Sequence, residues 1–149
     1  MKTLFGRPVW HNPRKLISFA LDGKDSSKQI FDIYSFSHAT HGILFYFLFK
    51  YLKIKPLTGL YLFIMLEFLW EIFENTEYII KKYRKTYKQY EGDSIVNIIG
   101  DVIFTTIGYM LAWKKPTFSI IYLILSEIVL IPYKANFMHL SIGSLLKKK

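Results

Sequence analysis

Four glutamates lie within a single apolar stretch, and this combination restricts the possible folds more than any other feature. The sequence EFLWEIFENTE places Glu67, Glu71, Glu74 and Glu77 inside the stretch 57–80, which is long enough to cross a bilayer as one helix. At about 100° per residue the first three glutamates share one narrow helical face, with the fourth at its edge. An ionisable group at the bilayer centre costs about 3 kcal/mol on insertion scales, so this face must look into a helical bundle.

The composition also favours a membrane protein. Hydrophobic residues make up 52% and aromatic residues 18% of the 149 residues, which is rich for a soluble domain of this size. The net charge of +9 comes from short basic clusters between apolar runs. Such clusters are typical of juxtamembrane anchors, so we expect no nucleic-acid partner. The absence of cysteine excludes disulfides and thiolate metal ligands.

Four stretches have the length and composition of membrane-spanning helices, namely 36–52, 57–80, 94–113 and 117–133. Short polar or basic segments join them. We therefore predict an all-α fold: an integral membrane bundle of four transmembrane helices with a short interfacial N-terminal helix.

The chain divides into three regions on this prediction. Residues 1–35 form an N-terminal interfacial segment and loop, residues 36–133 the four-helix transmembrane domain, and residues 134–149 a basic C-terminal tail. Asn12 and Pro13 have the character of an N-cap and a first helical turn, and an apolar face follows them. They predict the short interfacial helix.

The distribution of basic residues predicts the topology. Six Lys and Arg residues precede the first span, five lie between the second and third, and four follow the last, against three and two in the other connections. By the positive-inside rule, both termini and the second connection are cytoplasmic. The start of span one, the end of span two and the start of span three then lie at the same membrane face.

Polar residues gather at that face from three predicted helices. Paired spacings of i, i+3 or i, i+4 direct the members on each helix toward one place. They are His38 and His41, then Glu71, Glu74 and Glu77, then Asp93, Asn97 and Asp101.

Carboxylates and imidazoles from neighbouring helices are typical of metal sites inside helical bundles. Crowded carboxylates in a low dielectric must be neutralised by protons, bases or a cation. Oxygen and imidazole donors suit a divalent metal ion such as Mn, Fe, Zn or Mg. The candidate ligands are His38, His41, Glu71, Glu74 and Asp101.

Simpler explanations exist for these residues. Shared protons, Arg84 or a lysine of the second connection could neutralise the carboxylates, and the cluster could be a hydrogen-bonded plug that fixes helix register. Asp93 or the following Ser94 suits the N-cap of the third span. Gly42 and Asn75 suit close helix approach and helix–helix hydrogen bonding.

Three motifs, FSHATHG, WEIFENTEYIIKKYR and YEGDSIVNIIGD, occur in order along the chain. Across residues 26–112 the sequence resembles a family of small bacterial multi-pass membrane proteins, catalogued as domain of unknown function 2585. The resemblance implies a multi-pass protein of the bacterial inner membrane. The positions that match the family pattern are Ser26, Ser27, Gln29, Asp32, Tyr34, Ser37, His38, His41, Gly42, Trp70, Glu71, Glu74, Asn75, Gly92, Asp93, Ser94, Asn97, Gly100 and Asp101.

The family carries no established activity. Its members tend to have a further membrane helix ahead of the Ser-Ser stretch, where this chain shows no apolar run. With such a helix the polar cluster would face the periplasm, so the side that the cluster faces stays open.

The leading hypothesis is a metal-dependent membrane enzyme that acts on a lipid or polyprenyl head group. Glu67, Glu77 or Asp93 would act as general base, and Arg84 with nearby lysines would hold a phosphate. Membrane lipid is then the expected partner.

Two other classes remain. A proton- or cation-coupled transporter could use the same carboxylates in turn, and with only four spans it would need a homo-oligomer. It would also need the polar path to continue across the membrane, through Glu67 and Glu127. A structural membrane protein could use the cluster only as a buried polar network.

Overall fold

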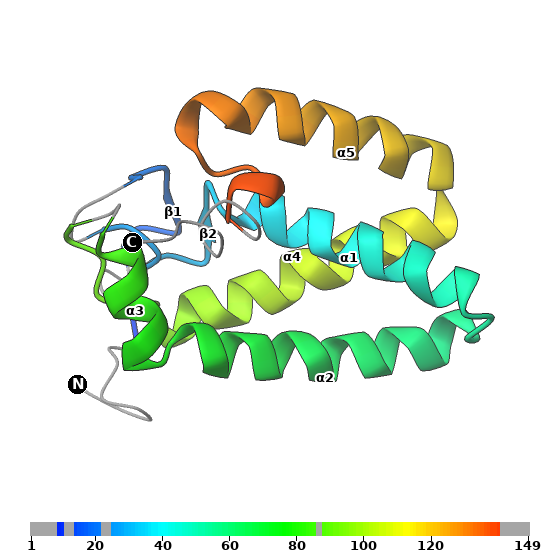
Figure 1. Ribbon diagram of the computed structural model, residues 1–149, viewed down its shortest axis with the longest axis horizontal. Coiled ribbons are helices and arrows are strands. Elements are labelled where there is room, and N and C mark those ends of the chain that lie inside the picture. The colour runs from blue at the N-terminus through cyan, green and yellow to red at the C-terminus, as the bar shows by residue number, and fades with distance from the viewer. Residues whose placement is uncertain (1–8, 11–13, 22–24, 86–87, 141–149) are drawn as a thin grey trace.

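The computed structural model describes residues 9–10, 14–21, 25–85 and 88–140. Helices dominate it, and four long helices form a bundle with a short helix and a pair of short strands at one end (Figure 1). In chain order the elements are β1 (Ile17–Ser18), β2 (Phe31–Asp32), α1 (Ser35–Tyr51), α2 (Pro56–Glu74), α3 (Glu77–Tyr83), α4 (Ile95–Lys114), α5 (Pro116–Leu130) and the 3₁₀ turn η2 (Ile131–Tyr133).

Helices α1 and α4 form the central pair, with α2 on one side and α5 on the other (Figure 1). Two glycines allow the pair to approach at backbone distance. A Cβ atom on Gly42 would lie 2.0 Å from the carbonyl oxygen of Thr105, and one on Gly108 would lie 2.0 Å from that of Ala39. The expectation that Gly42 permits close helix approach is therefore confirmed.

Among the described residues, three helical segments are long and apolar enough to cross a membrane: Pro56–Glu74, Ile95–Lys114 and Pro116–Tyr133. Helix α1 has 17 residues and carries serine, threonine and histidine in its first two turns, so it falls short of the same criterion. Three of the four predicted spans thus have the required length and composition, and the fourth stays a prediction. Exposed apolar side chains cover the outward faces of α2 and α5, as a lipid-facing surface requires.

The second predicted span is wrong at its end, because the helix stops at Glu74 instead of continuing to residue 80. The Asn75 side chain donates to the Glu71 carbonyl (3.0 Å) and to Asp93 Oδ2 (2.7 Å), and its Oδ1 accepts the Asp93 backbone N–H (2.8 Å). These bonds replace the next helical turn, and the extended backbone of Thr76 starts α3 in a new direction.

The interfacial N-terminal helix is also wrong for the residues described there. Residues 14–21 contain β1, which pairs in parallel with β2 through the register Ile17↔Phe31. This pairing satisfies backbone groups that a helix would otherwise have satisfied internally. The protein is therefore mostly helical rather than all-α; Asn12 and Pro13 lie outside the described residues.

Candidate metal centre

Asp32 fixes the start of α1, the helix that carries both candidate histidines. Its Oδ1 accepts the backbone N–H groups of Tyr34 (2.8 Å) and Ser35 (3.1 Å), while its own N–H donates to Ser35 Oγ. These bonds satisfy donors that the first helical turn leaves open. Burial raises the pKa of Asp32 to about 6, although the nearby charge of His38 and the backbone donors act in the opposite direction.

His38 forms the closest polar contact between α1 and α2. Its Nδ1 atom shares a hydrogen bond of 2.8 Å with Oε1 of Glu67, whose side chain is almost fully buried. Thr105 of α4 donates to the same carboxylate oxygen (2.8 Å) and to the His38 carbonyl (3.2 Å). Three helices therefore meet at one carboxylate.

Two more carboxylates lie beside His38. Oε1 of Glu71 is 3.7 Å from Nδ1, and Oδ2 of Asp101 is 3.8 Å from Nε2. Both side chains are buried, and within the described part of the chain both Glu71 oxygens and Asp101 Oδ1 lack a hydrogen-bond partner. A buried carboxylate oxygen without a donor is costly, so it calls for a proton or a cation.

Two overlapping groups of side chains could hold a metal ion. One joins His38, Glu71 and Asp101, and the other joins His38, His41 and Glu67; in each, one ligand atom per residue lies within 4.8 Å of the others. His41 Nδ1 stands 3.8 Å from Glu67 Oε2. The predicted convergence of spans one, two and three is therefore present in the fold.

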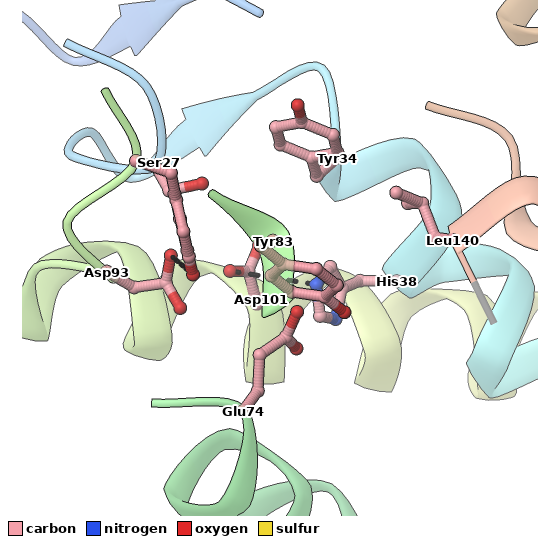
Figure 2. A pocket seen from close by; sticks show the side chains of 9 residues that line it. Ser27, Tyr34, His38, Glu74, Tyr83, Asp93, Asp101 and Leu140 are labelled. Atoms are coloured by element: carbon pink, nitrogen blue, oxygen red, sulfur yellow. Dashed lines mark hydrogen bonds and ion pairs between the residues drawn. The ribbon is translucent and has the colours of Figure 1, made fainter. Parts of the chain in front are cut away.

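A cavity of about 50 Å³ opens beside this cluster. Figure 2 shows His38, Glu74 and Asp101 directed toward the same space, with Asp93 on another side of it. Glu74, which the sequence offered as a ligand, lines the cavity but belongs to neither group of candidate ligands among the described residues.

Asp93 lies in a hydrogen-bonded frame around the cavity. Besides its bonds to Asn75, its Oδ1 accepts from the hydroxyl of Tyr90 (2.9 Å). Burial, together with the neighbouring Asp93 carboxylate, raises the pKa of Tyr90 well above its ordinary value, so the phenol stays a donor. Arg84 donates from Nε to the Tyr90 carbonyl (2.7 Å), so this atom holds the loop and not a phosphate.

The start of α4 is built around Ser94 and Asn97. Ser94 Oγ accepts the Asn97 N–H at 3.1 Å, which confirms the predicted N-cap. The Asn97 amide donates to the Gln29 carbonyl (2.9 Å) and to Asp32 Oδ2 (3.3 Å). Asn97 therefore joins the N-terminal loop to the bundle.

Glu77 and Glu127 lie away from the cluster. Glu77 has an exposed fraction of 87% for its side chain and pairs with Lys81 one turn later (3.1 Å), because the break at Thr76 turns it outward. Glu127 accepts from the Asn136 side chain (3.0 Å) and the Phe137 N–H (2.8 Å). It therefore anchors the C-terminal segment.

Sequence reasoning missed three side chains as parts of this region. Thr105 follows Asn97 and Asp101 at four-residue spacing, so the three form a polar stripe on one face of α4, and the sequence around Tyr90 indicates only an aromatic packing residue. Phe137 stacks edge-on against His41, with 4.8 Å between ring centroids, because the chain folds back after η2. The polar stripe on α4 was a signal for Thr105, but no local pattern indicates where Phe137 lies.

The family described as protein of unknown function (DUF2585) matches residues 4–146. The chain belongs to this family. The expected resemblance is thereby confirmed over nearly the whole chain.

Relatives with the name UPF0314 protein occur in several bacteria. The chain is 41% identical to the one of Brucella anthropi over 97 residues, which cover 62% of the chain and 50% of the relative. It is 33% identical to the one of Novosphingobium aromaticivorans over 117 residues, 72% of the chain and 56% of the relative. The chain thus spans about half the length of these relatives. No solved structure matches.

Proposed function

We propose that this protein is a metal-dependent enzyme of the bacterial inner membrane that hydrolyses a phosphate linkage in a lipid or polyprenyl head group. The observation that carries the proposal is the buried set His38, Glu71 and Asp101, in which carboxylate oxygens face one another without donors from the described residues. A divalent cation is the simplest species that satisfies all of these oxygens at once.

The donor set suits Mn, Fe, Zn or Mg. His38, Glu71 and Asp101 would hold the ion, while Glu67 fixes the orientation of the imidazole, as carboxylates do around metal-bound histidines. When bound, such an ion supplies a Lewis acid for a phosphoryl oxygen and lowers the pKa of a coordinated water.

The remaining cavity residues provide a base. Glu74 lines the cavity together with His38. It would take the proton of the attacking water as the new phosphorus–oxygen bond forms, and would pass that proton to the alkoxide released when the old phosphorus–oxygen bond breaks. Asp93 is engaged by Asn75 and Tyr90, which suits a frame better than a base. Glu77 is turned outward, so it has no support in this role.

We also propose that four helices span the membrane and that both termini are cytoplasmic. Helix α1 packs along α4 within the bundle, so it would be the fourth span despite its polar first turns (Figure 1). Its serines, its threonine and His38 are buried against neighbouring helices and so avoid lipid. The charge distribution supports cytoplasmic termini.

A closed polar path favours an enzyme over a transporter. Beyond Glu67 the described part of the bundle contains a cluster of buried apolar and aromatic side chains, among them Ile43, Phe63 and Tyr109. Glu127 does not extend the path, because its carboxylate is occupied by the C-terminal segment. A carrier would need polar groups along the whole route.

Elemental analysis of the detergent-purified protein tests the metal. We expect about one equivalent of a divalent metal, lost in His38→Ala and Glu71→Gln and retained in the exposed control Glu77→Gln. All variants must elute as folded, monodisperse protein. If the intact protein takes up no metal after incubation with Mn, Fe, Zn and Mg, the proposal is overturned.

Phosphate release tests the reaction. The metal-loaded protein should release phosphate from lipid or polyprenyl phosphates in mixed micelles, and Glu74→Gln should lose this activity while keeping the metal. Hydrolysis that persists unchanged in Glu74→Gln would remove Glu74 from the proposed mechanism.

A further inference from the structure

An apolar groove of about 390 Å³ lies between α1 and α2, beside the polar cluster. This volume is within the range of about 300 to 1,000 Å³ that is usual for small-molecule sites. One stripe of each helix forms its walls: His41 and Phe45 on α1, and Phe63, Leu66 and Trp70 on α2. The groove therefore lies in the space between these two helices.

The groove is apolar at one end and polar at the other. Phe45 and Phe63 stack with 4.5 Å between ring centroids at the apolar end. At the polar end, His41 Nδ1 lies 3.8 Å from Glu67 Oε2, and the other oxygen of Glu67 binds His38. One carboxylate thus separates the groove from the candidate metal centre.

Phe137 covers the polar end. Its ring meets His41 edge-on, and the Phe137 N–H is held by Glu127. A ligand in the groove would therefore meet mainly apolar and aromatic side chains, with His41 and Glu67 at one end.

We propose that this groove holds one hydrocarbon chain of a lipid phosphate and places its phosphate at the polar end beside His41, where a smaller cavity lined by His41, His38 and Glu74 leads toward the candidate metal centre. The inference rests on the proposed function and names how the substrate binds. The half-exposed Leu66 forms part of one wall, and Met65 and Leu69 are exposed on the same helix. The groove therefore opens toward the surface where membrane lipids would lie, so a lipid could enter sideways.

A hydrocarbon chain suits this lining better than a peptide does. Buried peptide groups need hydrogen-bond partners, and away from His41 and Glu67 the residues that line the groove offer chiefly apolar and aromatic surface. A methylene chain needs no partner and gains from the burial of its surface. The single polar end of the groove then matches the single phosphate of the lipid.

Photo-crosslinking of the full chain in detergent tests the proposal. The probe is a single-chain alkyl phosphate with a diazirine at the middle of the chain. We expect labelling of Phe45, Phe63 or Leu66, suppressed by excess unlabelled alkyl phosphate. Competition by a straight-chain alkyl phosphate and by a branched isoprenyl phosphate then shows whether the groove prefers the chain of a lipid or that of a polyprenyl phosphate.

Two matched tryptophan variants define the site. Leu66→Trp should reduce groove labelling at least about fivefold, because the indole occupies space that the chain needs. Leu69→Trp, on an exposed position that does not line the groove, should leave labelling unchanged. Equal labelling in both variants, or label spread evenly over the outward residues of α2, would overturn the proposal.

Photo-crosslinking of the Glu71→Gln variant tests lipid binding in the groove independently of metal binding. The variant should lose the metal but keep groove labelling, since Glu71 does not line the groove. If the intact protein binds metal but its groove is not labelled, only the lipid-groove proposal is rejected. If the groove is labelled but the intact protein binds no metal, only the metalloenzyme proposal is rejected.

Discussion

The Nδ1 atom of His38 lies 2.8 Å from Oε1 of Glu67, and this contact ties α1 to α2 inside the bundle. Thr105 completes it from α4, because its hydroxyl donates to the same oxygen. The candidate metal centre therefore depends on the exact distance between three helices.

Thr105→Val should weaken metal binding without unfolding the protein. The substitution keeps the shape but removes the donor to Glu67, so the carboxylate no longer fixes His38 in one orientation. Outer hydrogen bonds of this kind are worth about 10- to 100-fold in metal affinity. Metal titration of the two proteins measures the change. Thr106→Val is the control, since that hydroxyl bonds only to the Val102 carbonyl in the described structure; equal loss in both variants would refute the role of Thr105.

Gly108→Ala should destabilise the bundle. The added methyl group would lie 2.0 Å from the carbonyl oxygen of Ala39, so α1 and α4 must separate, at a cost of about 1 to 3 kcal/mol or more. Thermal unfolding in detergent measures this. At Gly59 the nearest atoms belong to the Tyr109 and Phe49 side chains, which can move, so Gly59→Ala should cost less. A larger loss of stability in Gly59→Ala than in Gly108→Ala would contradict the close backbone contact at Gly108.

The free energy of unfolding should fall as the pH rises from about 4 to about 6, because Asp32 loses its proton in this range. Its pKa in the folded protein is about 6, above the ordinary 3.8, so the folded state binds this proton more tightly than the unfolded state does. The stabilisation is complete below pH 3.8 and is lost as the pH rises through 6, by roughly 3 kcal/mol for a single group.

Chemical unfolding at a series of pH values tests this dependence. Asp32→Asn cannot titrate, so its stability should change less across the same interval. The Asn side chain can still accept the N–H groups of Tyr34 and Ser35. Parallel curves for the two proteins would show that Asp32 does not titrate in this range.

Glu127→Ala should release the C-terminal segment from the bundle. The carboxylate accepts from the Asn136 side chain and from the backbone of Phe137 and Met138, so its loss leaves three donors unsatisfied. Hydrogen exchange should become faster in residues 136–140 and remain unchanged in α4. Unaltered exchange in that segment would contradict the anchoring role.

Single-cysteine labelling tests the membrane topology. The chain has no cysteine, so each introduced thiol is read without background. With four spans, Lys53→Cys and Lys115→Cys should react with a membrane-impermeant reagent from outside the cell, and Lys85→Cys only after lysis. Lys15→Cys, which precedes α1, should likewise react only after lysis; if α1 does not cross the membrane, Lys15→Cys and Lys53→Cys will react from the same side.

The sequence by itself determined the number of long helices and the convergence of the cluster. Glutamates inside an apolar stretch cannot face lipid, and helical periodicity places His38 with His41, and Glu71 with Glu74, on one face of their own helices. The N-cap at Ser94 could also be read locally, because its partner Asn97 lies three positions on. At Gly42 the residue type alone indicated close helix approach, while its partner Thr105 lies on another helix.

Only the tertiary structure decided how far each element extends and which polar groups meet. The break after Glu74 depends on Asn75 bonding to Asp93, which is 18 positions away. The strand pairing that replaces the predicted N-terminal helix, and the return of Phe137 onto His41, likewise rest on partners distant in sequence. Local propensity does not contain these contacts, since their energy exists only when the helices are already packed.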